Sequence, residues 1–247
     1  MLLHVPDMPE KLTKISREEK ETGDPEKYLQ MKRFEAIVFD MDGLLIDSER
    51  IVLDAFLMVC DHFELGDRTE LLKQCIGTNR DYTRARMTEA FGAVVDFDEF
   101  QTLWTLKHQE IVGDDAMPLM EGVIELLDQI RALEIPRAVA TSTRSAHALD
   151  RLEKAGLLEY FEFVVGGDQV KNSKPDPEIY LSATQRLGCN PTRCLAFEDS
   201  ENGVRAALGA GLRVIQVPDL VQPSAAVRAL GHTILASLRD VPGHKFD

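Results

Sequence analysis

The sequence predicts an α/β protein in which a doubly wound parallel sheet carries an inserted helical domain. Short, largely apolar runs recur along the chain, as is typical of strands buried on both faces. Amphipathic helical segments separate these runs, and strands that alternate with helices favour a parallel sheet. One long segment, residues 51–117, has apolar residues at helical spacings and shows little β pattern.

The first expected strand is Ala36–Phe39, which ends abruptly in Asp40-Met41-Asp42-Gly43. The later expected strands are 137–140, 163–165, 194–197 and 214–217. The expected helices between them include residues 123–133, the segment around 149–152 and residues 179–187. In such sheets ligands bind beyond the carboxyl ends of the strands, so the residues that follow each strand are the candidates for a site.

The chain is expected to divide into three parts, since 247 residues accommodate one large and one smaller domain. Residues 1–33 are polar and mixed in charge, which predicts a poorly packed leader. Residues 34–50 and 118–247 form the expected Rossmann-like core, and residues 51–117 form an α-helical cap. The hinges of the cap are expected near residues 45–48 and 113–118.

The composition narrows the classes of partner. The chain has 28 Lys and Arg against 42 Asp and Glu, and a net charge of −14 argues against nucleic-acid binding. No apolar stretch approaches the ~18 to 20 residues that a membrane span needs. The four cysteines form no CxxC pair, which argues against a zinc site or a disulfide framework. We therefore expect a cytoplasmic protein and, because no heptad pattern appears, a monomer.

The motif Asp40-x-Asp42-Gly43 places two carboxylates at the end of the first strand. Such a pair is unfavourable unless a proton or a cation compensates it, and Mg²⁺ prefers oxygen ligands. Asp40 could then face the metal and act as a nucleophile, while Asp42 reaches toward a leaving group. The alternative interpretation is a turn that merely ends a strand.

Three further motifs follow expected strands or turns. Thr141-Ser142-Thr143 offers hydroxyl and N–H groups to an anion, although such residues also cap helices. Lys174, before a proline-stiffened turn, can hold a point charge over a phosphate or a carboxylate cluster, or lie solvated at the surface. Glu198 and Asp199 are adjacent acids at the end of a buried strand, which suggests metal ligation, with N-capping by Asp199 or Ser200 as the alternative.

The motifs FDMDG, ATST, KPDP and FEDSENGVRAALGAG, in this order, resemble those of the haloacid-dehalogenase-type phosphohydrolase superfamily. The resemblance extends from Phe34 to the C-terminus and is greatest to the branch with a helical cap, in the β-phosphoglucomutase and sugar-phosphatase subgroup. It implies a Mg²⁺-dependent phosphatase that hydrolyses a small phosphorylated metabolite, a sugar phosphate above all.

The resemblance also implies a role for each motif residue. Asp40 would attack the phosphorus and form an aspartyl-phosphate, and Asp42 would protonate the leaving alcohol and then activate water. Thr141 and Ser142 would bind phosphoryl oxygens, and Lys174 would steady Asp40 and the transferring group. The implied Mg²⁺ ligands are Asp40, the backbone carbonyl of Asp42, Asp199, and Glu198 directly or through water.

Other activities of the superfamily fit the sequence less well. Asp42 argues against a dehalogenase, and no cap lysine can be assigned as the Schiff-base residue of a phosphonatase. A β-phosphoglucomutase-like activity is the main alternative, but Val52 stands where that subgroup has a hinge histidine. Arg80, in Gly77-Thr78-Asn79-Arg80, resembles the cap arginine of that subgroup and could bind a second phosphate or a sugar-phosphate oxygen, or it could be a solvated arginine at the start of a helix. Lys107 resembles another substrate-facing cap lysine. A non-catalytic binding protein on the same fold is a lesser alternative.

Overall fold

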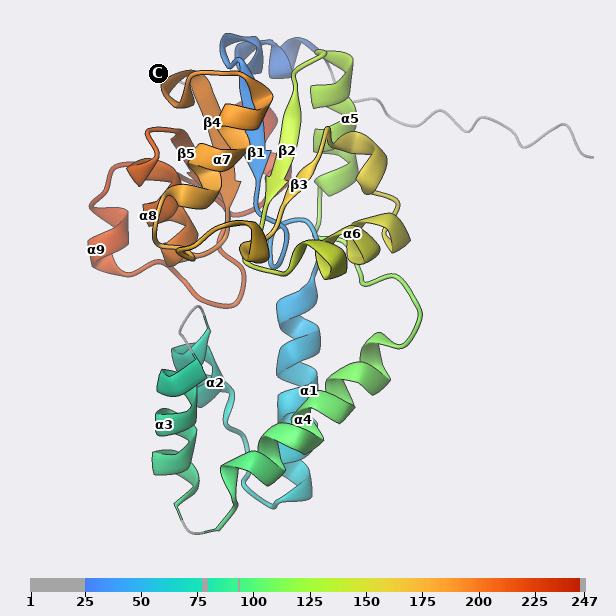
Figure 1. Ribbon diagram of the computed structural model, residues 1–247, viewed down its shortest axis with the longest axis vertical. Helices are drawn as coiled ribbons and strands as arrows, with labels where there is room; N and C mark the ends of the chain where they lie inside the picture. Colours follow the sequence, from blue (N-terminus) through green and yellow to red (C-terminus); the bar gives the residue numbers. More distant parts are fainter. Residues whose placement is uncertain (1–24, 77–79, 93, 245–247) are drawn as a thin grey trace, which may run out of the picture.

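The computed structural model describes residues 25–76, 80–92 and 94–244, so most of the expected leader lies outside the described residues. Within them, six strands form one sheet in the order β3-β2-β1-β4-β5-β6, and every neighbouring pair is parallel. Helices cover both faces of the sheet, and a separate group of helices lies beyond the carboxyl ends of the strands (Figure 1). The predicted doubly wound α/β fold is confirmed.

The strands follow the apolar runs of the sequence. All five expected strands agree with the structure to within one residue at either end, whereas β6 was not expected. The bounds are β1 Ala36–Phe39, β2 Arg137–Ala140, β3 Val164–Val165, β4 Cys194–Glu198, β5 Arg213–Gln216 and β6 Thr233–Ile234.

Successive residues of β1 face opposite sides of the sheet and enter two separate apolar clusters. Ile37 and Phe39 pack with helices on one face, while Ala36 and Val38 pack with helices on the other. Both faces are therefore covered, which explains why the strands are mostly apolar. The core helices are α5 Val123–Ala132, α6 Ser145–Lys154, α7 Glu178–Leu187, α8 Glu201–Gly209 and α9 Ala225–Arg228.

The end of the expected leader packs against the core. Pro25–Arg33 forms a 3-10 helix, in which Tyr28 and Met31 are buried in the apolar cluster that contains Phe39. This part of the polar segment therefore contributes to the core. The four cysteines are free thiols. No helix in the described part of the chain is both long and apolar enough to cross a membrane.

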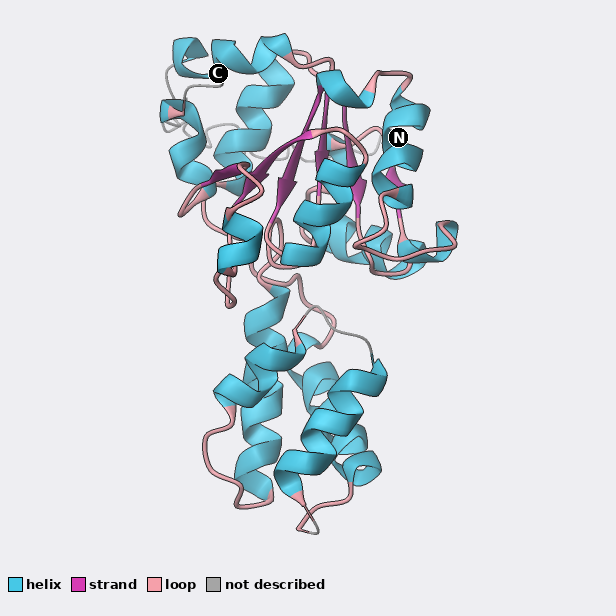
Figure 2. Cartoon of the chain, turned by 90° about the vertical axis from the view of Figure 1, so that its left-hand side faces the viewer, coloured by secondary structure: helices cyan, strands magenta, loops and turns pink. Residues whose placement is uncertain are grey.

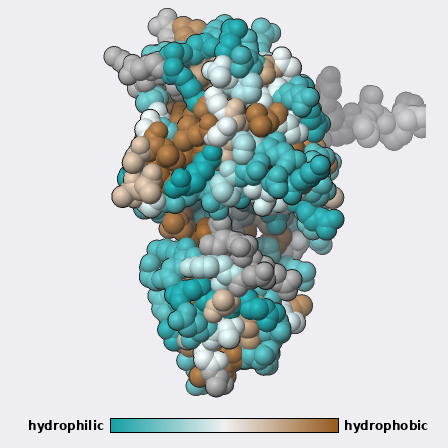
Figure 3. All heavy atoms as spheres, turned by 60° about the vertical axis from the view of Figure 1, so that its left-hand side comes forward, coloured by the Kyte–Doolittle hydropathy of each residue, from teal (hydrophilic) through white to brown (hydrophobic). Residues whose placement is uncertain are grey.

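In the described part of the chain, the cap consists of helices α1 to α4, which lie below the sheet at the end to which the strands point (Figure 2). Phe56 and Phe100 are fully buried at its centre, and their rings meet edge to face with centroids 5.5 Å apart. Polar side chains cover much of its visible surface (Figure 3). The cap helices are α1 Ser48–His62, α2 Thr69–Cys75, α3 Arg80–Phe91 and α4 Phe97–Val112.

The two connections between core and cap lie side by side. Ile46 and Leu119 form an antiparallel bridge. The Asp47 N–H donates to the Pro118 carbonyl at 2.8 Å, and the Met120 N–H donates to the Leu45 carbonyl at 3.1 Å. Because the two connections pair with each other, the cap is joined to the core at a single place, beyond the carboxyl ends of the strands.

Candidate active site

The predicted site residues meet at the carboxyl edge of the sheet. Phe39 pairs with Phe197 in β4 and with Val139 in β2, so these three strands end at nearly the same level. Asp40 and Asp199 therefore emerge next to each other, and the parallel register brings together motifs that are far apart in the sequence. Asp40, Thr141, Glu198 and Asp199 are all buried there.

Lys174 is the central cation of this cluster. Its Nζ donates to Asp40 Oδ1 at 2.6 Å, to Glu198 Oε1 at 2.6 Å and to the Ala140 carbonyl at 3.0 Å. The Lys174 side chain is 6% exposed, so solvent screens these charge-assisted bonds little. Burial alone lowers the pKa of Lys174, but the charges of Asp40 and Glu198 outweigh it and raise the pKa above its ordinary value.

Glu198 is held from three sides. Its Oε1 accepts hydrogen bonds from Lys174 and from the Tyr180 hydroxyl at 2.6 Å, and its Oε2 accepts one from the Ser200 hydroxyl at 3.1 Å. Burial, followed by the charge of Glu198, raises the pKa of Tyr180, so this phenol remains a donor. These contacts fix Glu198 as the partner of Lys174, a position that the acidic motif alone did not specify.

Asp40, Glu198 and Asp199 form a cluster with the composition of a cation site. One oxygen from each lies within 4.8 Å of the others, and all three residues are buried. Burial and the neighbouring carboxylates raise the pKa of Asp40 to about 8 despite the opposing effect of Lys174, and burial and Glu198 raise that of Asp199. One lysine thus leaves excess negative charge, and a hard divalent cation with oxygen ligands fits this donor set.

Two glycines allow the backbone to approach the carboxylates. A Cβ on Gly43, which has a φ of +76°, would lie 2.6 Å from Asp199 Oδ2. A Cβ on Gly203 in α8 would lie 1.8 Å from Glu198 Oε1. Any side chain at either position would displace an acid of the cluster.

Asp42 does not contact Lys174, and its carboxylate instead accepts hydrogen bonds from hydroxyl and guanidinium groups. Its Oδ1 accepts from Ser48 Oγ at 2.9 Å and from Arg151 Nη1 at 2.8 Å, and its Oδ2 accepts from Thr143 Oγ1 at 2.6 Å. The Thr141 hydroxyl is more distant from Oδ2, at 3.4 Å. The sequence does not indicate that Ser48, Thr143 or Arg151 contacts Asp42, because the three residues come from separate elements.

The loop after β2 keeps its polar groups near the cluster. The Thr143 N–H donates to Thr141 Oγ1 at 3.1 Å, and the Thr141 N–H donates to the Val165 carbonyl at 3.0 Å. Thr141 is buried and Ser142 is exposed. Close contact with the Ser142 carbonyl leaves no room for a side chain at Gly167, where a Cβ would lie 2.3 Å away.

The structure places the expected cap residues less specifically. Lys107 pairs with Glu110 of the same helix at 2.6 Å, and the Val52 carbonyl accepts a hydrogen bond from Trp104 Nε1 at 3.1 Å. Arg80 begins α3, but its side chain and residues 77–79 lie outside the described part of the structure. Roles for Arg80 and Lys107 in substrate binding therefore remain predictions.

A cavity of about 380 Å³ adjoins the acidic cluster between core and cap. Asp199 and Ser200 line its core side, and Ile76 lines its cap side. A cavity of this size is in the range that accommodates a small metabolite.

This fold and site define a class: a two-domain α/β enzyme in which a buried aspartate and lysine meet a candidate cation site under a helical cap. The sequence pattern described as "Haloacid dehalogenase-like hydrolase" matches residues 37–217. The chain belongs to this family, as the four motifs predict.

Curated relatives and solved structures agree with this assignment. The chain is 35% identical over 181 residues to "Phosphorylated carbohydrates phosphatase" of Thermotoga maritima, which covers 73% of this chain and 83% of the relative. It is 31% identical over 188 residues to "Fructose-1-phosphate phosphatase YqaB" of Escherichia coli, covering 75% and 97%. A putative beta-phosphoglucomutase from Thermotoga maritima superposes with a TM-score of 0.70 at 31% identity, covering 85% and 97%.

Proposed function

We propose that the protein is a Mg²⁺-dependent phosphatase that hydrolyses a sugar phosphate or a similar small phosphorylated metabolite through an aspartyl-phosphate intermediate. The observation that carries this proposal is Lys174 Nζ, which lies 2.6 Å from both Asp40 and Glu198 at the edge of the sheet. Relatives named as phosphatases of phosphorylated carbohydrates and of fructose 1-phosphate support the reaction and the substrate class.

In the first half of the reaction, a carboxylate oxygen of Asp40 attacks the phosphorus. The bond between phosphorus and the ester oxygen breaks, and Asp42 donates a proton to the leaving oxygen. Lys174 offsets the repulsion between the attacking carboxylate and the phosphate dianion. The Thr141 hydroxyl and the Ser142 N–H bind phosphoryl oxygens in this scheme.

In the second half, Asp42 accepts a proton from a water molecule that attacks the aspartyl-phosphate. The bond between phosphorus and the Asp40 oxygen breaks, phosphate leaves and the carboxylate of Asp40 is restored. One aspartate is therefore a nucleophile in the buried cluster, and the other is a general acid and base. Their surroundings suit these separate roles, since Asp40 contacts Lys174 whereas Asp42 contacts Ser48, Thr143 and Arg151.

The metal ligands proposed are Asp40, the backbone carbonyl of Asp42, and Asp199, with Glu198 acting directly or through water. The three carboxylates lie close enough to share one cation. Since Glu198 already accepts from Lys174, Tyr180 and Ser200, a bond through water is consistent with its contacts. A bound Mg²⁺ supplies positive charge to the phosphoryl oxygens and to the attacking carboxylate.

A phosphomutase is the second candidate, because a solved structure titled as a putative beta-phosphoglucomutase is 31% identical to this chain. Val52, on the first cap helix, gives its carbonyl to Trp104, and its side chain packs partly buried in the apolar cluster of the cap. An apolar side chain at this position offers no hydrogen bond to a sugar hydroxyl. This observation favours transfer of the phosphoryl group to water.

A phosphate-release screen tests the proposal. Phosphorylated sugars and other small metabolites are assayed with and without Mg²⁺, using the wild type, Asp40→Asn and the surface control Asp61→Asn. The wild type and the control are expected to release phosphate only with Mg²⁺, whereas Asp40→Asn loses at least ~1000-fold in turnover. Equal release by Asp40→Asn and the wild type would refute the role of Asp40.

The same protein preparations distinguish a phosphatase from a phosphomutase. The enzyme is incubated with β-glucose 1-phosphate and its bisphosphate activator, and both free phosphate and glucose 6-phosphate are measured. The phosphatase proposal expects free phosphate to accumulate faster. Faster accumulation of glucose 6-phosphate would reverse the order of the two candidates.

A further inference from the structure

Arg151 is a charged contact of Asp42 that the motifs do not include. Its Nη1 donates to Asp42 Oδ1 at 2.8 Å, while Ser48 and Thr143 hold the same carboxylate through neutral hydroxyl groups. Among the described residues, Arg151 is the sole cation that forms an ion pair with Asp42. It comes from α6, far from Asp42 in the sequence.

The chemistry of these donors makes Arg151 the one that sets the direction of the carboxylate. A hydroxyl rotates about its C–O bond and can donate or accept, so Ser48 and Thr143 can adapt to more than one orientation of Asp42. A guanidinium is planar, always charged and only a donor. Its hydrogen bond to a carboxylate joins two ionised groups, whereas the donor in a bond from a hydroxyl is neutral.

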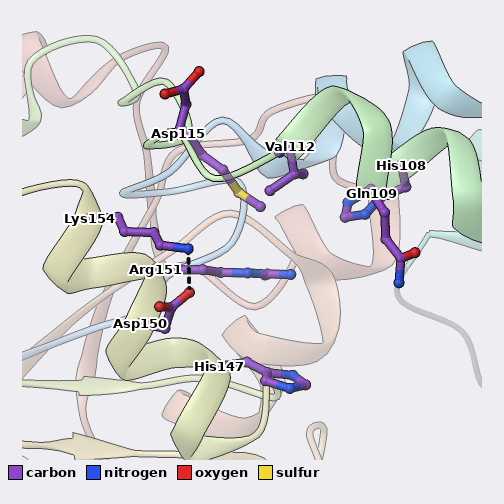
Figure 4. Close-up of a pocket in the computed structure, with 10 residues that line it drawn as sticks. His108, Gln109, Val112, Asp115, His147, Asp150, Arg151 and Lys154 are labelled. Atoms are coloured by element: carbon purple, nitrogen blue, oxygen red, sulfur yellow. Dashed lines mark ion pairs between the residues drawn. The ribbon is translucent and has the colours of Figure 1, made fainter.

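The fold holds Arg151 at the junction of core and cap. Ala148 and Leu152, on the buried side of α6, are fully buried and anchor the helix to the core. The Arg151 side chain is 25% exposed and projects into a cavity of about 240 Å³ between α6 and cap helix α4 (Figure 4). Burial, and after it the charge of Arg151, lowers the pKa of His108 on α4, consistent with the guanidinium lying near the cap.

Lys154 provides an internal comparison on the same helix. It lines the same cavity, but it pairs with Asp150 at 3.2 Å, and both of these side chains are exposed. An exposed pair of this kind contributes little energy. Lys154 therefore matches Arg151 in charge and in location on α6 without touching Asp42.

We propose that Arg151 is a positioning residue for the reaction: it directs the Asp42 carboxylate first toward the leaving oxygen and then toward the attacking water. This inference rests on the proposed function, because it presupposes that Asp42 transfers both protons. A sugar alkoxide needs a proton to leave, so both halves of its hydrolysis depend on Asp42. A p-nitrophenolate leaves without one, so only the second half of that reaction depends on Asp42.

Pre-steady-state kinetics of Arg151→Met and Lys154→Met test the proposal with two substrates. These are p-nitrophenyl phosphate and the sugar phosphate with the highest turnover in the screen above. Arg151→Met is expected to lower kcat for the sugar phosphate by about 100-fold, the lower range for loss of general acid–base catalysis. With p-nitrophenyl phosphate it is expected to release a rapid burst of p-nitrophenol that approaches the enzyme concentration, because the aspartyl-phosphate accumulates.

The controls separate positioning from other roles. Lys154→Met should behave as the wild type with both substrates, and Arg151→Lys, which keeps the charge, should recover part of the lost rate. An active and folded Arg151→Met that slows both substrates equally without a burst would overturn the proposal. A rise in KM limited to substrates with a second anionic group, at unchanged kcat, would also overturn it, because Arg151 would then bind substrate directly.

Failure of the proposed function has a different signature. A wild type that releases phosphate from neither substrate, with or without Mg²⁺, would refute the phosphatase and the role of Arg151 together. A wild type that is active and sensitive to Asp40→Asn, beside an Arg151→Met that keeps wild-type kinetics, would refute the role of Arg151 alone. Thermal unfolding of each variant checks that the fold is intact, and Arg151→Gln replaces Arg151→Met where it is not.

Discussion

The core and the cap bury different kinds of side chain. The core buries Asp40, Glu198 and Asp199 around Lys174, although charges are costly to remove from water. The cap buries apolar and aromatic side chains around Phe100, and its ion pairs lie at the surface. In the proposed function, the core carries the chemistry at a cost in stability, whereas the cap folds around an apolar centre and covers the site.

The strongest test of this comparison is Lys174→Met, which removes the central cation of the core. We expect kcat/KM to fall by at least ~100-fold because the lysine charge that helps to offset the repulsion between Asp40 and the phosphate dianion is lost. The free energy of unfolding at pH 7 should fall by roughly 3–5 kcal/mol, because removing one partner of a buried ion pair leaves the other charge without compensation. Kinetic assays and urea unfolding measure the two effects, with Lys154→Met as the exposed control.

A second test changes only the space beside Glu198. Gly203→Ala would place a Cβ 1.8 Å from Glu198 Oε1, so the carboxylate that Lys174 contacts must shift. Gly209→Ala is the matched control on the same helix, because its Cβ would meet Pro177 at an ordinary 3.6 Å. We expect activity to fall about tenfold or more in the first variant alone, from loss of charge stabilisation. Equal activity of the two variants would show that the position of Glu198 does not matter.

A third test removes the centre of the cap. Phe100→Ala deletes a fully buried ring that packs on Phe56, Phe91 and Trp104, so the cap should lose about 3–5 kcal/mol of stability. Limited proteolysis should then cut within the cap while the core resists. Cleavage of p-nitrophenyl phosphate should persist more than cleavage of sugar phosphates, since the core retains its catalytic groups. A single cooperative loss of both regions would contradict their separation.

The smallest expected effect lies at the hinge, where burial and Asp219 raise the pKa of Glu49 from 4.5 to about 7. Because the pKa of this carboxyl is higher in the folded state, the folded protein loses stability as pH rises from about 4.5 to about 7. Glu49→Gln removes this penalty, so its Tm should exceed that of the wild type at pH 8 and match it near pH 4.5. Thermal scans in EDTA measure the difference in Tm between the two proteins. The same difference in Tm at pH 8 and at pH 4.5 would show that the titration of Glu49 is not its cause.

Much of the core could be predicted because its signals are local in the sequence. Ala36–Phe39 is an unbroken apolar run, and Asp40 follows it directly, so the strand and the candidate nucleophile are found together. The parallel register then places Glu198 and Asp199 beside Asp40. Strand β6 was missed, because the polar residues His232 and Thr233 leave it without an apolar run like the one that contains β3. The burial of Met31 was missed because it lies within a polar segment.

The partners of these residues could not be predicted because they depend on how helices pack. Arg151 reads in the sequence as an ordinary surface arginine, and only the rotation of α6 against the sheet brings it to Asp42. Tyr180 reads as a core residue of α7, yet its hydroxyl reaches Glu198. Periodicity identifies which face of a helix is buried but not which distant atom its polar end will meet.

The most direct test of the central claim is to find where the phosphoryl group resides during turnover. The wild type is mixed with p-nitrophenyl phosphate and Mg²⁺, quenched in acid within milliseconds, digested and analysed by mass spectrometry. We expect the peptide containing Asp40 to gain the mass of one phosphoryl group, and the corresponding peptide of Asp40→Asn not to gain it. A phosphoryl group on another residue, or none during active turnover, would contradict this expectation.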